Sequence, residues 1–223
     1  MTRTTNARIA GVTYLAYIAL GIPAMVLFDR ASNAQGTAAR LARIAQHASD
    51  VRIALLLTLL TCFAALVLAV ALYGITRDQD RELAVLALSC RVGEGVLNAV
   101  GPLITLGLLW LGTAANEAGA PDAEALGGLL LKVRGWSGTI SATFFAVGST
   151  VFSFLLLRGR MVTVPLAWLG VGASVLLVVG LPLELAGFFG GPVVWLMWLP
   201  MLVFEVALAL WLLIKGVAVP ERG

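Results

Sequence analysis

Six long apolar segments, separated by polar ones, make up most of the chain. A helix needs about 20 predominantly apolar residues to cross the hydrocarbon core of a bilayer, and each segment is long enough to do so. The predicted crossings are residues 9–28, 53–76, 83–113, 136–157, 166–185 and 193–214. We therefore predict an all-α, polytopic membrane protein whose residues 1–223 form a single domain, a bundle of six transmembrane helices.

The connection between the first and second crossings, residues 31–52, has apolar residues at the spacing of an amphipathic helix. The apolar positions are Leu41, Ile44, Ala45, Ala48 and Val51, with Arg40, Arg43 and His47 between them. We expect this helix to lie at the membrane interface. Arg40, Arg43 and Arg52 could contact an anionic lipid headgroup there, although an ordinary solvated or lipid-touching face is the simpler interpretation.

The connection between the third and fourth crossings, residues 114–135, is also long. Its charged residues include Glu117, Asp122, Glu124, Lys132 and Arg134. The pair Pro121-Asp122 is typical of a helix start, because proline fits the first helical position and an acidic side chain suits the first turn.

The composition agrees with a protein that lies mostly in lipid. The chain is 60% hydrophobic and 12% charged, whereas a soluble domain has roughly 25% charged residues. Its net charge is +3, and the basic residues are dispersed along the chain. A nucleic-acid partner is therefore not expected, because binding nucleic acid needs lysine and arginine clustered on one face.

Lysine and arginine also predict the orientation, because cytoplasmic loops carry an excess of them. With the N-terminus inside, the cytoplasmic segments hold eight such residues and the outer segments hold six. Both termini are therefore expected in the cytoplasm, since six crossings return the chain to the side on which it started.

A few polar residues lie inside the predicted crossings. Arg91 and Glu94 are three residues apart, so they share a helix face, and Asn98 continues that face. Measured along the helices, Arg91 and Glu94 lie roughly 12 Å and 17 Å from one side of the membrane, and Glu205 lies roughly 15 Å from the same side. An ionised side chain at the centre of a membrane helix costs about 2.5–3.5 kcal/mol on insertion scales. We therefore expect these residues to meet away from lipid.

One positive and two negative charges leave an excess of one negative charge if Arg91, Glu94 and Glu205 are sequestered together. Either one carboxylic acid keeps its proton, or a cation or water completes the site. One hypothesis is a binding site formed by Arg91, Glu94, Asn98 and Glu205. The other is an arginine–glutamate clamp that only fixes helix packing.

Signatures of an enzyme are missing from the sequence. The chain has one histidine and two cysteines, too few for a cluster of metal ligands. It has no Gly-x-Ser-x-Gly nucleophile motif and no phosphate-binding or dinucleotide-binding glycine motif. We therefore predict no catalytic residue, no metal and no cofactor, and an enzymatic role is the less favoured one.

Four stretches resemble a known family. They are Ala7 to Leu15 (ARIAGVTYL), Arg52 at the start of the second crossing, Pro165 to Gly170 (PLAWLG), and Glu205 to Val217 (EVALALWLLIKGV). Together they resemble the bacterial membrane protein family catalogued as domain of unknown function 4386. The resemblance implies a multi-pass protein of the bacterial cytoplasmic membrane and no particular chemistry. Many members carry a histidine after a Phe-Phe-Gly-Leu stretch, whereas here Phe144-Phe145-Ala146-Val147 is followed by Gly148.

Three functions follow from these observations. The leading one is a non-catalytic binder or transporter of a small molecule, lipid or ion that uses the buried Arg/Glu centre. The second is a structural or regulatory subunit that docks another membrane protein or a second copy of itself. The third is an unrecognised enzyme acting on lipid.

Overall fold

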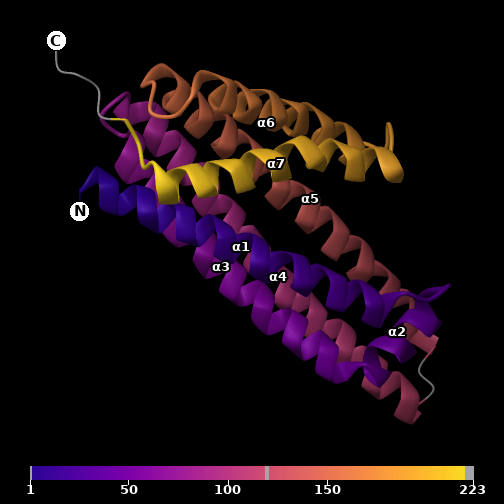
Figure 1. Cartoon of the computed structure of the whole chain (residues 1–223). Coiled ribbons are helices and arrows are strands. Elements are labelled where there is room, and N and C mark those ends of the chain that lie inside the picture. The colour runs from indigo at the N-terminus through magenta and orange to yellow at the C-terminus, as the bar shows by residue number, and fades with distance from the viewer. Residues whose placement is uncertain (1, 119–120, 219–223) are drawn as a thin grey trace. The chain divides into compact units, whose positions relative to one another are not determined.

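The computed structural model describes residues 2–118 and 121–218 of the chain. Within these ranges it contains seven helices and no strand (Figure 1). In chain order the helices are α1 (Arg3–Ser32), α2 (Thr37–Gln46), α3 (Ala48–Thr76), α4 (Arg81–Ala118), α5 (Pro121–Arg158), α6 (Val164–Leu185) and α7 (Pro192–Ile214).

All of these helices except α2 are long and apolar enough to cross a membrane. The predicted all-α fold with six crossings is therefore confirmed. Large apolar side chains point outward from these helices, for example Phe63 at 65% exposure and Leu103 at 68%. Extended apolar surface of this kind is typical of a protein that contacts lipid. The chain is a multi-pass membrane protein.

The helices are longer than the predicted crossings, most of all on α5. This helix begins at Pro121, as the sequence indicates, but it runs without a break to Arg158. Most of the long connection expected before residue 136 is therefore helical. Lys132 and Arg134, which were expected in this connection, lie within α5. Lysine and arginine are good helix formers, so their charges do not end a helix.

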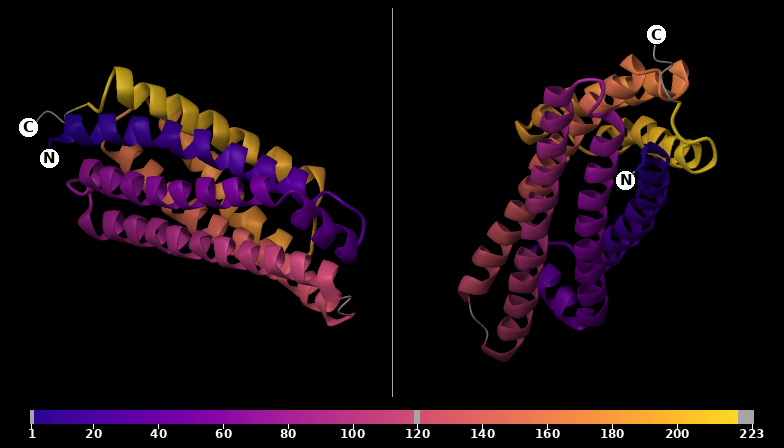
Figure 2. Two further views of the ribbon diagram at one scale, coloured as in Figure 1. Left: turned by 90° about the horizontal axis from the view of Figure 1, so that it is seen from below. Right: turned by 90° about the vertical axis from the view of Figure 1, so that its left-hand side faces the viewer.

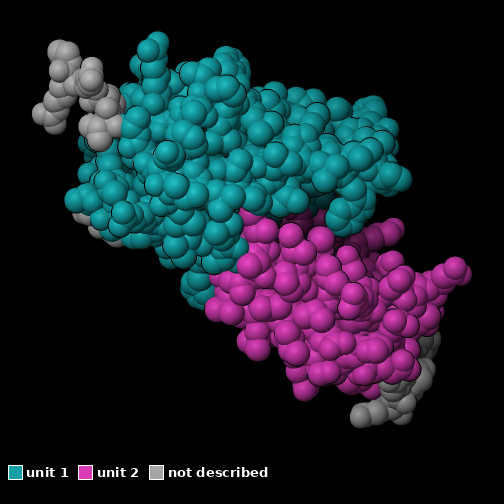
Figure 3. Space-filling model, viewed as in Figure 1, with its two compact units in different colours: residues 1–17, 63–95, 139–223 teal, residues 18–62, 96–138 magenta. Residues whose placement is uncertain are grey.

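By its internal contacts the chain divides into two compact units (Figure 3). Unit 1 comprises residues 1–17, 63–95 and 139–223, and unit 2 comprises residues 18–62 and 96–138. Helices α6 and α7 belong to unit 1 and α2 belongs to unit 2, whereas α1, α3, α4 and α5 each contribute a part to both.

Unit 1 is built on close helix contacts at small residues. Helices α6 and α7 lie side by side (Figure 1), and α7 also packs along the N-terminal part of α1 (Figure 2). A Cβ atom added to Gly11 of α1 would lie 2.6 Å from Cγ of Leu213 on α7, and one added to Gly170 of α6 would meet the ring of Phe204. Small residues allow this approach, which membrane helices use in place of a hydrophobic driving force.

Ion pairs hold the turn between α3 and α4 to two other segments of unit 1. Arg3 Nη2 donates a hydrogen bond to Asp78 Oδ2 at 3.0 Å, and Arg158 Nη1 donates to Asp80 Oδ2 at 3.2 Å. Asp80 also accepts the backbone N–H of Leu83 at 3.1 Å, which satisfies one donor at the start of α4. The start of α1, this turn and the end of α5 therefore lie together.

Helix α2 is amphipathic, but its predicted position at the membrane interface needs correction. Its apolar side chains Leu41 and Ile44 are buried by other helices of unit 2. A Cβ atom added to Gly112 of α4 would lie 2.5 Å from the Leu41 carbonyl oxygen, and one added to Gly127 of α5 would lie 2.7 Å from Leu41 Cδ1. Glycine at these two positions lets α2 pack on protein, so its apolar face is covered by helices and does not need lipid.

Candidate functional site

The buried charges of unit 1 begin with an ion pair on one face of α4. Arg91 and Glu94 are each only 1% exposed, and Arg91 Nη1 lies 2.9 Å from Glu94 Oε2. The two residues are three positions apart, which places their side chains on neighbouring positions of the helix surface. The direction of the N–H groups does not meet hydrogen-bond geometry, so we describe the contact as an electrostatic pair.

Aromatic rings surround the guanidinium of Arg91. Its Cζ lies 4.6 Å from the ring centroid of Phe145 on α5 and 5.7 Å from that of Tyr17 on α1. A cation over an aromatic face is attracted by the electrons of the ring, and the attraction is larger where water is excluded. The rings therefore replace part of the hydration that Arg91 loses by burial.

Glu94 is held by hydroxyl groups from two further helices. The Tyr17 hydroxyl donates to Glu94 Oε1 at 3.0 Å, and the Ser141 hydroxyl of α5 donates to the Glu94 backbone carbonyl at 3.0 Å. A hydrogen bond to a charged group contributes roughly 1.5–3 kcal/mol. Together with Arg91, these contacts fix both the side chain and the backbone of Glu94.

Glu205 of α7 is the second carboxylate of this region. It is 6% exposed, and its Oε1 atom is buried without a hydrogen-bond partner among the described residues. Its charge interacts through space with Arg91, Glu94 and Tyr14. Tyr14 is itself buried, at 3% exposure. The structure therefore brings three of the predicted site residues into one region, which we call the polar centre: Arg91, Glu94 and Glu205, with Tyr14, Tyr17 and Ser141 around them.

The polar centre has fewer hydrogen bonds than its buried polar atoms require. In the described part of the chain, Nε, Nη1 and Nη2 of Arg91, Oε2 of Glu94 and Oε1 of Glu205 make none. Buried polar side-chain atoms are nearly always bonded to protein or to ordered water. These atoms are therefore free to bond to a further group: the two carboxylate oxygens could take a proton, a cation or water, and the Arg91 N–H groups could donate to water.

Asn98, the fourth predicted site residue, forms no hydrogen bond with Arg91, Glu94 or Glu205 in the described part of the chain. It lies one helical turn beyond Glu94 on α4 but belongs to unit 2. There it lines a pocket of about 200 Å³ together with Asp29 of α1 and Arg134 of α5.

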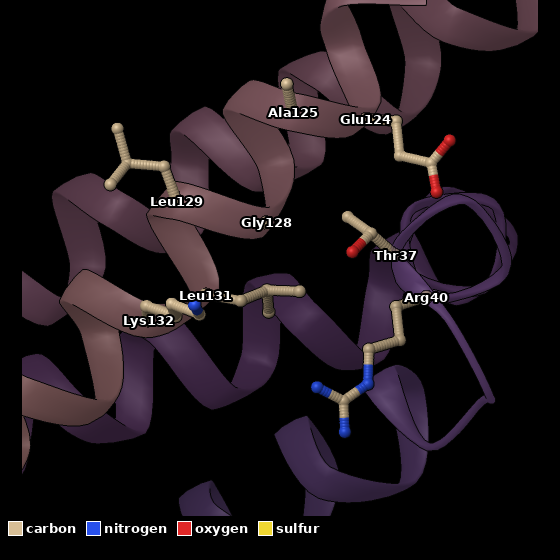
Figure 4. A pocket seen from close by; sticks show the side chains of 8 residues that line it. All are labelled: Thr37, Arg40, Glu124, Ala125, Gly128, Leu129, Leu131 and Lys132. Atoms are coloured by element: carbon tan, nitrogen blue, oxygen red, sulfur yellow. The ribbon is translucent and has the colours of Figure 1, made fainter.

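The three arginines expected at lipid headgroups have different surroundings. Arg40 of α2 lines a pocket of about 660 Å³ with Thr37, Glu124 and Lys132 (Figure 4). Arg43 Nε donates to the carbonyl oxygen of Arg30, in the last turn of α1, at 3.2 Å. Arg52 is exposed near the start of α3. Of the three, Arg40 alone lines that pocket.

Sequence reasoning missed Tyr14, Tyr17 and Arg134. A tyrosine in an apolar run has no distinctive pattern, although both tyrosines follow Gly11 on the first crossing and lie three residues apart. Arg134 was assigned to a connection, and only the continuous helix from Pro121 shows that it belongs to α5.

The family model for Domain of unknown function (DUF4386) matches residues 9–216, nearly the whole chain. The chain belongs to this family. The resemblance drawn from the four sequence stretches is therefore confirmed. Searches of curated proteins and of solved structures found no match. The description of the DUF4386 family names no activity, so the chemistry has to be inferred from the polar centre itself.

Many DUF4386 members are expected to carry a histidine after a Phe-Phe-Gly-Leu stretch, whereas this chain has Gly148 after Phe144-Phe145-Ala146-Val147. The structure gives a physical reason for this glycine. A Cβ atom added to Gly148 would lie 3.0 Å from Arg91 Cγ and 3.1 Å from the Ala87 carbonyl oxygen. The stem of Arg91 and the backbone of α4 already fill that space. In this chain, a side chain at residue 148 would displace Arg91.

Proposed function

We propose that this DUF4386 protein is a non-catalytic binder or transporter of a small solute or ion, and that a proton held at Glu205 takes part in its cycle. One observation carries the proposal. Glu205 is a second buried carboxylate beside an ion pair that is already neutral, and its Oε1 has no hydrogen-bond partner among the described residues.

The charge balance supports a proton in this position. Arg91 neutralises Glu94, so an ionised Glu205 would leave one negative charge inside a membrane-spanning region. On insertion scales such a charge costs about 2.5–3.5 kcal/mol. In the part of the chain that the structure describes, no three His, Cys, Asp or Glu side chains come together as metal ligands. A proton needs no ligand cluster and no cavity.

The polar centre combines a fixed ion pair on one helix with a second carboxylate on another. Arg91 and Glu94 stand on one helix and are fixed by Tyr17 and Ser141. Glu205 stands on α7, a different helix. Releasing the proton would make Glu205 anionic and attract it to Arg91, so the charge state of Glu205 changes the force between α7 and α4. A local change of charge that biases packing in this way is a common switching device.

Infrared difference spectroscopy tests the bound proton directly. The full-length protein, reconstituted in lipid nanodiscs, would be titrated while the carbonyl band of protonated carboxylic acids is recorded. We expect the wild type to show such a band from a buried group, and Glu205→Gln to lose it. The matched control is Glu184→Gln, the same change at the end of α6, which should keep the band.

A wild-type spectrum with no buried carboxylic acid band would sink the proposal. So would a band that persists unchanged in the Glu205 variant, because the proton would then reside elsewhere.

Purification in mild detergent compares this function with the alternatives. A discrete particle that carries a bound small molecule or lipid supports the binder. A stable complex with another membrane protein supports the docking subunit instead. Turnover of a lipid by the purified protein, lost in Arg91→Gln, would support an enzyme.

We further propose that both termini face the cytoplasm of a bacterial inner membrane. The excess of lysine and arginine in the inner segments supports this orientation. Arg3, Arg158 and the turn between α3 and α4 lie together at one end of unit 1, so these segments share one side of the membrane in either orientation. Green fluorescent protein fused to the C-terminus should fluoresce, and alkaline phosphatase fused there should be inactive. The reverse result would place the termini outside.

A further inference from the structure

Unit 2 contains a pocket whose wall carries both signs of charge. Its volume is about 200 Å³, below the roughly 300–1,000 Å³ typical of pockets for drug-sized ligands. The polar residues of the wall come from four helices: Asp29 of α1, Thr58 and Thr61 of α3, Asn98 of α4 and Arg134 of α5. A ligand of this pocket would therefore be a small polar solute.

Arg134 is held in place by contacts that leave part of its guanidinium available. Its Cζ lies 3.5 Å from the ring centroid of Phe28, and its Nε lies 3.4 Å from the Thr105 hydroxyl, a long hydrogen bond. Neither contact uses its two Nη atoms. A planar guanidinium with two parallel N–H groups suits a carboxylate, which it can bind in a bidentate manner.

Asp29 carries the negative charge of the pocket and does not form an ion pair with Arg134. The two side chains interact electrostatically, yet in the described chain they form no ion pair within 4 Å. Asp29 is exposed near the end of α1. Two opposite charges that line one pocket and do not touch can each bind a different end of the same ligand.

The rest of the wall fits the body of such a ligand. The Asn98 side-chain amide can donate and accept hydrogen bonds. The hydroxyls of Thr58 and Thr61 donate to their own helix, to the carbonyls of Ala54 and Leu57 at 2.8 Å each, and their oxygens can still accept. The apolar part of the wall consists of Gly21, Ala24, Met25 and Cys62.

We propose that this pocket binds a small zwitterion of the α-amino acid type, with its carboxylate on Arg134 and its ammonium group on Asp29. Asn98 lines the same pocket and would orient the ligand by hydrogen bonds from its amide. The proposal stands on unit 2 alone and does not depend on the proton at Glu205.

Isothermal titration calorimetry on the full-length protein in nanodiscs tests the pocket with three probes, L-alanine and two analogues that each carry only one of its two charges. L-Alanine carries both charges, propionate only the carboxylate and ethylamine only the ammonium group. We expect saturable binding of L-alanine and binding of the other two at least about tenfold weaker, because each loses a charge-assisted hydrogen bond. Asp29→Asn and Arg134→Gln should each weaken L-alanine binding by about tenfold or more.

Matched controls come from the same unit. Asp50→Asn and Arg52→Gln make the same chemical changes on α3, outside the pocket, and should leave L-alanine binding unchanged. Asp29 is exposed, so its variant keeps the test decisive even if Arg134→Gln impairs folding.

Three results would overturn the proposal. The first is that none of three amino acids with different side chains, L-alanine, L-serine and L-leucine, binds. The second is binding of propionate as tight as that of L-alanine, which would make the pocket an anion site. The third is undiminished L-alanine binding by Asp29→Asn.

Discussion

Arg91 in unit 1 and Arg134 in unit 2 both place a guanidinium against a phenylalanine ring within a membrane-spanning helix. Around Arg91 a carboxylate is in contact, at 2.9 Å, and both partners are almost fully buried. Around Arg134 the nearest opposite charge acts from across a pocket. The same residue type thus forms a closed pair in one unit and lines an open pocket in the other. The two arginines differ in whether a carboxylate touches the guanidinium.

The largest effect is expected from breaking the closed pair. Arg91→Gln leaves Glu94 buried without its cation, and removing one partner of a buried pair costs about 3–5 kcal/mol. We expect the free energy of unfolding in detergent micelles to fall by that amount. The double variant Arg91→Gln/Glu94→Gln should recover most of it, because no unpaired charge of the pair remains. Wild-type stability in the single variant would show that the pair is not sequestered.

The next effect should come from the hydroxyl that holds the pair. Tyr17→Phe removes the 3.0 Å hydrogen bond to Glu94 and keeps the ring, so we expect a loss of about 1.5–3 kcal/mol in the free energy of unfolding. Tyr73→Phe on α3, the same change elsewhere in unit 1, serves as the control and should have a smaller effect. Equal losses for the two variants would argue against a specific role of Tyr17.

Within unit 2, we expect the largest loss of stability from a change in helix packing. Gly112→Ala would bring a Cβ atom within 2.5 Å of the Leu41 carbonyl oxygen, and overpacking of this kind costs about 1–3 kcal/mol. Gly138→Ala is the matched control, because a Cβ atom there meets nothing within 4 Å. Thermal unfolding of both variants checks the difference. A harmless Gly112→Ala would mean that α2 is not packed on α4.

The smallest effect is expected from the open site. Arg134→Gln abolishes the contact with the Phe28 ring but leaves no buried charge unpaired, because Asp29 is exposed, so the loss should be about 0.5–1 kcal/mol. The same unfolding measurement applies. A loss as large as that of Arg91→Gln would erase the distinction between the two arginines.

The sequence predicted the crossings because a surface that faces lipid has to be apolar along its whole length. It also predicted that Arg91, Glu94 and Glu205 would avoid lipid, for the same energetic reason. The fate of Asn98 was not predictable. A shared helix face does not ensure shared neighbours, and between Gly95 and Val96 the partners of α4 change from those of unit 1 to those of unit 2.

The position of α2 could not be predicted either. An amphipathic pattern shows that one face needs cover, but the pattern is the same whether lipid or protein supplies it. Here the apolar face of α2 packs at Gly112 of α4 and Gly127 of α5, which are far from α2 in the sequence. Only the tertiary structure brings them to α2.

The spacing of Arg91 and Glu94 on a single helix also bears on how the chain is made. Their opposite charges are close neighbours as soon as α4 has formed, before any later helix is synthesised. During insertion by the translocon, the crossing part of α4, residues 83–113, can therefore enter the bilayer with no net charge, because Arg91 and Glu94 are its only charged residues. Glu205 lies on α7, the last helix to be synthesised. The second buried carboxylate therefore enters the membrane only at the end of insertion.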